Sequence, residues 1–427
     1  MTRTRLLACP LLVALVLSGC KPGATGHSED ADGPGEPSTE ARKDIEPLVK
    51  GNNEFALDLY ARQRDADANL FFSPMSISVA MAMVHTGARD RTAEQIAKAL
   101  HFNLEGDRLN SAIGALQWDL NKQSESGGYQ LHVANALWGD KSVSFHDDFL
   151  NILKEKYGSP LRTVSFADNP HETSDAINDW VSRQTHEKIK EIVGPEDFKE
   201  ELGNHTAFLL ANAIYFKGEW NTKFEKKDTK GETFYLKSRK DVKVPFMSVT
   251  STFRYLQGET FQALEMPYKG KDVSLIAFLP DKFAGIADFE KDLTADKLDG
   301  WIKKMRSTKL IVVFPPFKMQ TQFELAGTLK DLGIEDAFDP EHADFKGMAE
   351  APPMYLGFVR HKAFIELNEE GTEAAAVTAV KGSSAASGSA HHDSPKVFCA
   401  DHPFLFLIRD NNSGSIMFLG RVMDPRP

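Results

Sequence analysis

The chain has 427 residues, of which 41% are hydrophobic, 26% charged and 10% aromatic, a composition typical of globular proteins and unlike that of disordered, collagenous or membrane-spanning chains. Its 61 acidic residues outnumber 50 Lys and Arg, for a formal net charge of -11, which argues against nucleic acid and anionic membrane surfaces as partners. The length favours two or more domains, and the 3 cysteines exclude a disulfide-built scaffold.

Residues 1–19 are predicted to be a secretory signal peptide, because two early arginines precede an apolar run too short for a spanning helix of about 20 residues. The run ends in Leu-Ser-Gly-Cys, which resembles the lipobox of bacterial lipoproteins. Cleavage there would leave Cys20 as the lipid-bearing N-terminus, whereas an ordinary signal peptide with a chance cysteine is the alternative. Processing would also leave Cys399 as the single free thiol.

Residues 20–46 are predicted to be a flexible, lipid-anchored tether. The segment from residue 21 contains four Gly, three Pro and seven acidic residues, with almost nothing apolar to bury. We therefore expect an extracytoplasmic protein in the cell envelope or on the cell surface, which contacts the membrane only through the lipid on Cys20.

The rest of the chain alternates helical and strand patterns, which indicates a mixed α+β class. The predicted helices are 53–62, 74–84 with Ser73 as cap, 92–100, 145–157, 174–186 and 323–332. The predicted strands are 131–138, 207–215, 234–235, 253–255, 262–267, 273–279, 309–314 and 363–367, followed by a hairpin of 404–408 and 415–422.

A long segment between the strand ending at Leu367 and Phe398 has neither a helical nor a turn pattern. A structureless loop of more than about 20 residues inside a compact domain is uncommon, and is usually functional or disordered. Only about 30 residues follow it, and they form two core strands that need a partner sheet. The segment is therefore a loop that leaves the body and returns, not a linker between domains.

Within this loop, every even position from Thr372 to Ser384 is small or β-branched and uncharged, whereas Glu373 and Lys381 occupy odd positions. As a strand, the segment would have one small, uncharged face and one face that carries both charges. An alanine-rich linker would give the same pattern. The alternation of even and odd positions therefore leaves both interpretations open, a strand with two different faces or a linker.

Eight ordered segments are distributed over nearly the whole chain after residue 47: FFSPMSISVAMAMVHTGA (71–88), ANALW (134–138), AINDWVSRQTHEKI (176–189), LLANAIYFKGEWNTKF (209–224), SLIAFLPD (274–281), LKDLGIEDAF (329–338), HKAFIELNEEGTEAAA (361–376) and HPFLFLIRD (402–410). In this order they resemble the serpin family of serine protease inhibitors. The resemblance implies one domain over residues 47–427, in place of two, with three β-sheets, about nine helices and an exposed reactive-centre loop at about 370–397.

The resemblance implies a protease inhibitor, not an enzyme. In this family the loop is presented to the protease as a substrate. The protease cleaves it and forms an acyl-enzyme, and the cleaved loop then inserts into the central sheet as a new strand. The tethered protease is distorted before it can deacylate. The implied partner is a serine protease, elastase-like or subtilisin-like, with a cysteine protease as a further candidate. The inhibitor would be a monomer without a cofactor.

The family's hinge, where inhibitory members keep short side chains, corresponds to Gly371, Thr372, Glu373, Ala374, Ala375 and Ala376. Counting from this hinge in the family register places the scissile bond at Ala385-Ala386. A trypsin-like cleavage at Lys381 is the alternative, although it would shorten the inserting strand by four residues. The loop is longer than usual after Ala386, so the register stays open by several residues.

Two further groups of residues match family positions under the central sheet. The first is the polar cluster called the shutter, whose hydrogen bonds tune how readily the strands part: Ser73, Ser76, Asn212 and His361. The second is Trp220, at the breach, the top of the sheet where insertion begins. Ordinary satisfied core groups are the structural alternative for all five.

The sequence contains no strong signature of an enzyme active site or of a metal site. The chain has no G-x-S-x-G elbow, H-E-x-x-H motif or Walker loop. The run His391-His392-Asp393 could ligate a metal but is more simply explained as solvated loop, so we expect no metal site, and Cys399 reads as a packed thiol. A non-inhibitory serpin acting as a carrier, chaperone or binding surface is the alternative function; charged, bulky or proline residues at Thr372, Ala374 or Ala376 would favour it, and none is present.

Overall fold

The computed structural model describes residues 35–64, 67–125, 127–166, 169–200, 208–238, 240–281, 285–291, 293–350, 354–372 and 395–426. The helices are α1 (Thr39–Lys43), α2 (Ile45–Gln63), α3 (Pro74–Gly87), α4 (Asp90–Ala99), α5 (Gly106–Glu125), α6 (Asp147–Tyr157), α7 (Pro170–Gln184), α8 (Asp197–Glu200), α9 (Ile286–Lys291), α10 (Ala295–Lys304) and α11 (Ala326–Asp331), with short 3-10 turns η2 (Lys226–Asp228) and η3 (Asp336–Phe338). The strands are β1 (Leu70–Phe72), β2 (Tyr129–Asp140), β3 (Arg162–Val164), β4 (Phe208–Glu219), β5 (Lys230–Tyr235), β6 (Asp241–Gln257), β7 (Phe261–Pro267), β8 (Val273–Pro280), β9 (Arg306–Phe314), β10 (Phe317–Glu324), β11 (Leu356–Asn368), β12 (Gly371–Thr372), β13 (Lys396–Cys399), β14 (Phe404–Asp410) and β15 (Ile416–Val422).

The strands form two large sheets and a small ladder that the long strand β6 shares with the second sheet. The six-stranded sheet has the order β10-β11-β12-β4-β2-β3, and β11 also pairs directly with β4. The second sheet has the order β1-β15-β14-β8-β7-β6-β9-β13. Beside it, β5 pairs with the first residues of β6 in a separate ladder. The mixed α+β, three-sheet architecture expected from the resemblance is confirmed.

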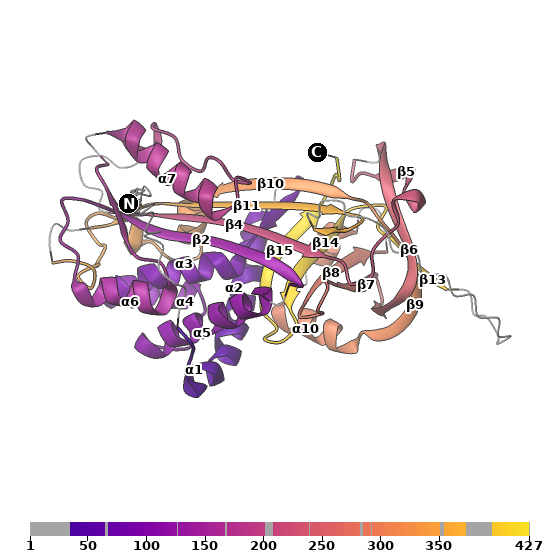
Figure 1. Cartoon of the computed structure of the whole chain (residues 1–427), viewed down its shortest axis with the longest axis horizontal. Helices are drawn as coiled ribbons and strands as arrows, with labels where there is room; N and C mark the ends of the chain where they lie inside the picture. Colours follow the sequence, from indigo (N-terminus) through magenta and orange to yellow (C-terminus); the bar gives the residue numbers. More distant parts are fainter. Residues whose placement is uncertain are drawn as a thin grey trace, which may run out of the picture.

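The six-stranded sheet is covered on both faces (Figure 1). Helix α7 lies on one face, and α2 to α6 lie on the other. Helix α3, nearly all of which is buried, contacts β2 and β4 of this sheet and β15 of the second sheet. The main hydrophobic core fills the space between the sheets, and a smaller core lies between α7 and the outer face.

Helix α3 begins as the sequence predicts. The Ser73 hydroxyl accepts a hydrogen bond from the Ser76 backbone N–H at 3.1 Å, and Pro74 occupies the first turn. The C-terminal hairpin is also confirmed, because β14 and β15 pair antiparallel. Both elements lie under the six-stranded sheet and fix the position of the polar cluster described below.

Two predictions about elements need correction, and one helix was missed. The folded body begins before residue 47: α1 and the start of α2 are helical, and Ala41 and Ile45 are buried, so the predicted tether is shorter at its C-terminal end. The predicted helix 323–332 begins as a strand, because Phe323 continues the period-two pattern of β10 and pairs with His361. Helix α5 was not predicted, although its buried leucines recur at helical spacing.

The N-terminal predictions remain predictions. The signal peptide at 1–19 and the lipid-bearing Cys20 lie outside the described residues. Among the helices of the described ranges, none combines the length and the apolar character needed to cross a bilayer.

Candidate functional site at the seam of the six-stranded sheet

The centre of the six-stranded sheet is a seam between β4 and β11. The two strands pair directly and in parallel from Phe208 beside Leu356 up to Tyr215 beside Phe364. Beyond this point they diverge, and β12 enters between them, antiparallel to both. The first two residues of the predicted hinge therefore already form a short strand inside the sheet.

Gly371 is required at this entry point. Its φ is +151°, and a Cβ built there would lie 2.0 Å from the carbonyl oxygen of Gly218. Gly218 is confined in turn, because its own Cβ would lie 2.7 Å from the ring of Tyr268. The chain can thus turn from β11 into the seam only with glycine at the first hinge position.

Thr372 points into the core between the two sheets. Its side chain is fully buried, and its hydroxyl is hydrogen-bonded to the Tyr268 hydroxyl at 2.7 Å. Burial raises the pKa of Tyr268 well above its usual value, so the phenol stays protonated and able to donate. Thr372 therefore occupies the inward-facing side that the parity of the loop predicts for even positions; the later even positions lie outside the described residues.

The turn between β11 and β12 is held by a group of contacts around Trp220. The indole stacks on Tyr268 with ring centroids 4.6 Å apart, and its Nε1 donates to the Asn368 carbonyl at 2.9 Å. The backbone N–H of Trp220 donates to the Glu370 carbonyl at 2.9 Å, and Thr229 donates to the Glu369 carboxylate at 2.7 Å. Trp220 thus supports the start of the hinge directly.

Below the entry point, a buried polar cluster crosses the seam. Asn212 of β4 is the register partner of His361 on β11 and of Asn135 on β2. The Asn212 side-chain amide donates to the Ser76 hydroxyl at 2.6 Å, to the Ser76 carbonyl at 3.1 Å and to Asn135 Oδ1. His361 Nδ1–H donates to Asn212 Oδ1. These hydrogen bonds join three strands of the sheet to the first turn of α3.

The second ring nitrogen of His361 fixes its charge state. Its Nε2 accepts a hydrogen bond from the Ser73 backbone N–H at 3.1 Å, which requires an unprotonated nitrogen. Complete burial lowers the pKa of His361 to about 3, so the ring is neutral at physiological pH. The Ser73 hydroxyl donates to the Met417 carbonyl at 2.6 Å, which connects the cluster to β15. The structure thus brings Ser73, Ser76, Asn212 and His361 into direct contact.

The outer face of the seam is covered by α7 and the segment that follows it. The smaller core includes Ile177 and Val181 from α7 together with Phe358 and Phe364 from β11. Polar contacts add to this cover, since Arg360 forms an ion pair with Asp197 at 2.6 Å. Any widening of the seam must therefore disturb the α7 layer.

The remaining predicted loop residues lie outside the described residues. They are Glu373, Ala374, Ala375, Ala376, Lys381, Ala385, Ala386, His391, His392 and Asp393. The far end of the loop returns at β13, which pairs with β9 in the second sheet, so the two ends of the loop are held by different sheets.

Burial raises the pKa of Cys399 in β13 to about 11, which keeps its thiol protonated and poorly nucleophilic. In the described part of the chain, no group of three or more His, Cys, Asp or Glu side chains could hold a metal.

Sequence reasoning missed two residues of this site. Asn135 could have been predicted, because Ala-Asn-Ala occurs in both β2 and β4, and an amide inside an apolar strand must find a partner. Tyr268 follows β7 on the other sheet, and only the three-dimensional packing shows that it reaches Thr372.

Comparisons with known proteins agree with this geometry. The family model described as "Serpin (serine protease inhibitor)" matches residues 50–425. The chain is 39% identical to human Serpin B3 over 398 residues, which cover 88% of this chain and 99% of the relative. It is 38% identical to human leukocyte elastase inhibitor over 391 residues, which cover 89% of this chain and all of the relative. The crystal structure of the thermophilic serpin tengpin in its native state superposes with a TM-score of 0.80 at 28% identity, covering 92% of this chain and 97% of that one.

Proposed function

Since the chain belongs to the serpin family of serine protease inhibitors, we propose that it is a suicide inhibitor that traps its protease by inserting the cleaved loop into the six-stranded sheet. The observation that carries this proposal is β12. A small hinge residue, Thr372, is already accommodated between β4 and β11, with its side chain buried and hydrogen-bonded. Loop insertion in this family is a recognised form of β-strand addition.

The pairing of the strands supplies a driving force for further insertion. Directly below β12, β4 and β11 are parallel neighbours. A strand that continued from β12 would be antiparallel to both, and would replace one parallel ladder with two antiparallel ladders, which are slightly more stable per residue. About ten additional hydrogen bonds, at about 1 kcal/mol net each, would contribute on the order of 10 kcal/mol.

We propose an elastase-like or subtilisin-like protease as the target. The assigned scissile bond, Ala385-Ala386, has a small residue on each side, which suits a shallow or apolar specificity pocket. The similarity to leukocyte elastase inhibitor supports the same class of target.

The decisive experiment incubates the protein with pancreatic elastase and, separately, with subtilisin, followed by denaturing electrophoresis. We expect a covalent complex that survives SDS, together with loss of protease activity. The same enzymes with a chemically blocked active-site serine should give no such band. Clean cleavage of the loop by a panel of serine and cysteine proteases, without any stable complex, would contradict inhibition and favour a carrier or binding role.

The substitution Thr372→Arg tests the insertion step. An arginine at this fully buried position would place an unpaired charge in the core at the entry to the seam, at a cost of several kcal/mol. We expect the ratio of trapped to merely cleaved inhibitor to fall by more than about tenfold. The matched variant Thr260→Arg, at an exposed position in the turn between β6 and β7, should inhibit like the unmodified chain. Undiminished trapping by Thr372→Arg would refute the insertion account.

We also propose that Cys20 carries a lipid and that the protein acts at the cell envelope or cell surface. The lipobox-like sequence before Cys20 and the polar segment after it support this location. Expression in a bacterial host with a radiolabelled fatty acid should label the protein, and Cys20→Ser should abolish the label. Equal labelling of the variant, or none in either protein, would contradict the anchor.

A further inference from the structure

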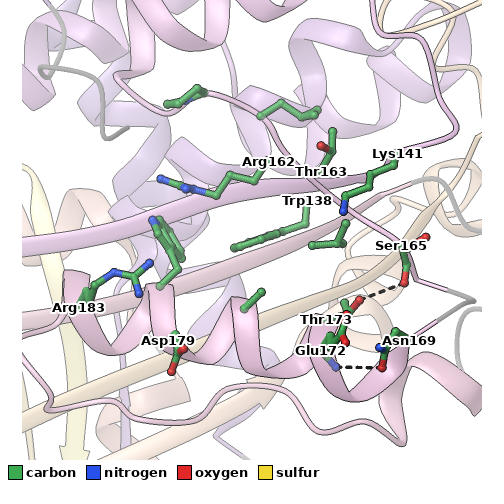
Figure 2. A pocket seen from close by; sticks show the side chains of 15 residues that line it. Trp138, Lys141, Arg162, Thr163, Ser165, Asn169, Glu172, Thr173, Asp179 and Arg183 are labelled. Atoms are coloured by element: carbon green, nitrogen blue, oxygen red, sulfur yellow. Dashed lines mark hydrogen bonds between the residues drawn. The ribbon is translucent and has the colours of Figure 1, made fainter. Parts of the chain in front are cut away.

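A second feature lies away from the seam, between α7 and the ends of β2 and β3. Here the structure contains a hollow of about 680 Å³, within the size range of small-molecule sites. Figure 2 shows its two sides: Trp138, Lys141 and Arg162 project from the strand side, and Arg183 projects from α7. None of these four residues belongs to the seam.

One wall of the hollow is aromatic. Trp138 and Trp180 meet edge to face, with ring centroids 5.9 Å apart, and are only 4% and 5% exposed. The guanidinium of Arg162 lies over both rings, 5.9 Å from the centroid of Trp138 and 5.1 Å from that of Trp180. A planar apolar group entering the hollow would meet indole surface.

The same wall carries polar groups without partners. The Nε1–H groups of Trp138 and Trp180 are both buried and have no hydrogen-bond acceptor in the described structure. A buried indole normally finds an acceptor, and an unmade hydrogen bond of this kind is costly. By contrast, the Trp220 indole at the breach donates to a backbone carbonyl. Both indoles of this wall therefore keep a buried donor without an acceptor, just behind the surface of the hollow.

The charges around the hollow have the opposite sign to the chain as a whole. Three cations line it, Lys141, Arg162 and Arg183, against the two carboxylates of Glu172 and Asp179. In Figure 2 the Asp179 carboxylate points away from Trp138, toward the far side of α7. A protein with a formal net charge of -11 thus has a locally basic recess next to an aromatic wall.

From these observations we infer that the hollow between α7 and the ends of β2 and β3 binds a small aromatic carboxylate. The ring packs against Trp138 and Trp180, and the carboxylate pairs with Arg183 at the C-terminal end of α7. The inference does not rest on protease inhibition, because binding can be measured in the absence of any protease.

The test is titration calorimetry of the full-length protein with 1-naphthoate, with neutral 1-naphthamide and inorganic phosphate as comparison ligands. We expect 1-naphthoate to bind with one-to-one stoichiometry, and naphthamide and phosphate each to bind at least about tenfold more weakly. In an NMR titration with naphthoate, the indole N–H signals of Trp138 and Trp180 should shift, whereas that of Trp220 should not. Equal affinity for naphthoate and naphthamide would overturn the charge recognition, and no binding at millimolar ligand would overturn the site.

Two charge substitutions locate the site. Arg183→Gln removes an exposed cation of the hollow without disturbing the core, and should weaken naphthoate binding by about tenfold. Lys303→Gln is the matched control, because Lys303 lines a second hollow of about 860 Å³ between α2 and α10. It should leave the affinity unchanged. Loss of binding in Lys303→Gln but not in Arg183→Gln would place the ligand in the second hollow and refute the assignment.

Discussion

The seam of the six-stranded sheet is built differently at its upper end, where β12 enters, and at its centre, where Asn212 pairs with His361. At the upper end, backbone ladders, glycine and stacked aromatic rings surround β12, and the Thr372 side chain makes one hydrogen bond there, to Tyr268. At the centre, Asn212 and His361 join the strands through side-chain hydrogen bonds that need one orientation of every partner. The upper end requires glycine at Gly371 and one side-chain hydrogen bond at Thr372, whereas the polar cluster at the centre has to be rearranged before a strand can pass. In the proposed mechanism, the first region sets where insertion starts, and the second opposes its progress.

The largest expected effect comes from removing the Asn212 side chain from the polar cluster at the centre of the seam. Asn212→Ala removes one acceptor and one donor group, and leaves the buried Nδ1–H of His361 without an acceptor. We expect the free energy of unfolding to fall by about 3 kcal/mol, measured by denaturant titration. Asn221→Ala, at an exposed position after β4, should change it by less than about 0.5 kcal/mol. A similarly small effect of Asn212→Ala would mean that the central cluster does not hold the strands together.

The next largest effect is the dependence of the free energy of unfolding on pH that His361 gives to the centre of the seam. The pKa of His361 is about 3 in the folded protein, below the ordinary value of 6.5. Below pH 6.5 the unfolded chain therefore binds a proton that the folded chain does not, so the stabilisation is complete above pH 6.5 and declines as the pH falls toward 3. The slope from this residue approaches about 1.4 kcal/mol per pH unit, or about 2 kcal/mol between pH 6.5 and 5.

The measurement compares the pH dependence of unfolding in wild type and His361→Gln. His132, whose pKa burial and His186 lower to about 4, contributes a slope of its own in both proteins. The difference between the two slopes thus isolates His361. Parallel profiles would show that His361 titrates normally and that the centre is open to water.

The smallest effect concerns the upper end. Tyr268→Phe keeps the ring stacked on Trp220 but removes the hydrogen bond to Thr372. We expect β12 to lose about 1 kcal/mol and its amide hydrogens to exchange about fivefold faster. Thr372→Val removes the same bond from the other side, and the double variant should be less destabilised than the sum of the two single variants. Strict additivity would show that the two hydroxyls do not interact.

The sequence allowed more of the centre than of the upper end to be predicted. Ser73, Ser76, Asn212 and His361 stand inside apolar helix and strand patterns, where a polar group has to find a partner, and the resemblance assigned them together. The environment of the hinge depends on Tyr268 and Thr229, which are far from it in the chain and carry no local signal. For the same reason, the strand at Phe323 became clear only through its pairing with His361, since its period-two pattern runs directly into a helix.

The stacking of Trp220 on Tyr268 has an optical consequence. The indole touches both the residue that receives Thr372 and the carbonyl of Asn368 just before the hinge, so any advance of the loop changes the surroundings of this fluorophore. Four other tryptophans contribute background emission. If the cleaved loop inserts as proposed, the intrinsic emission of Trp220 will therefore report, in real time and without a label, the moment at which the sheet begins to accept its new strand.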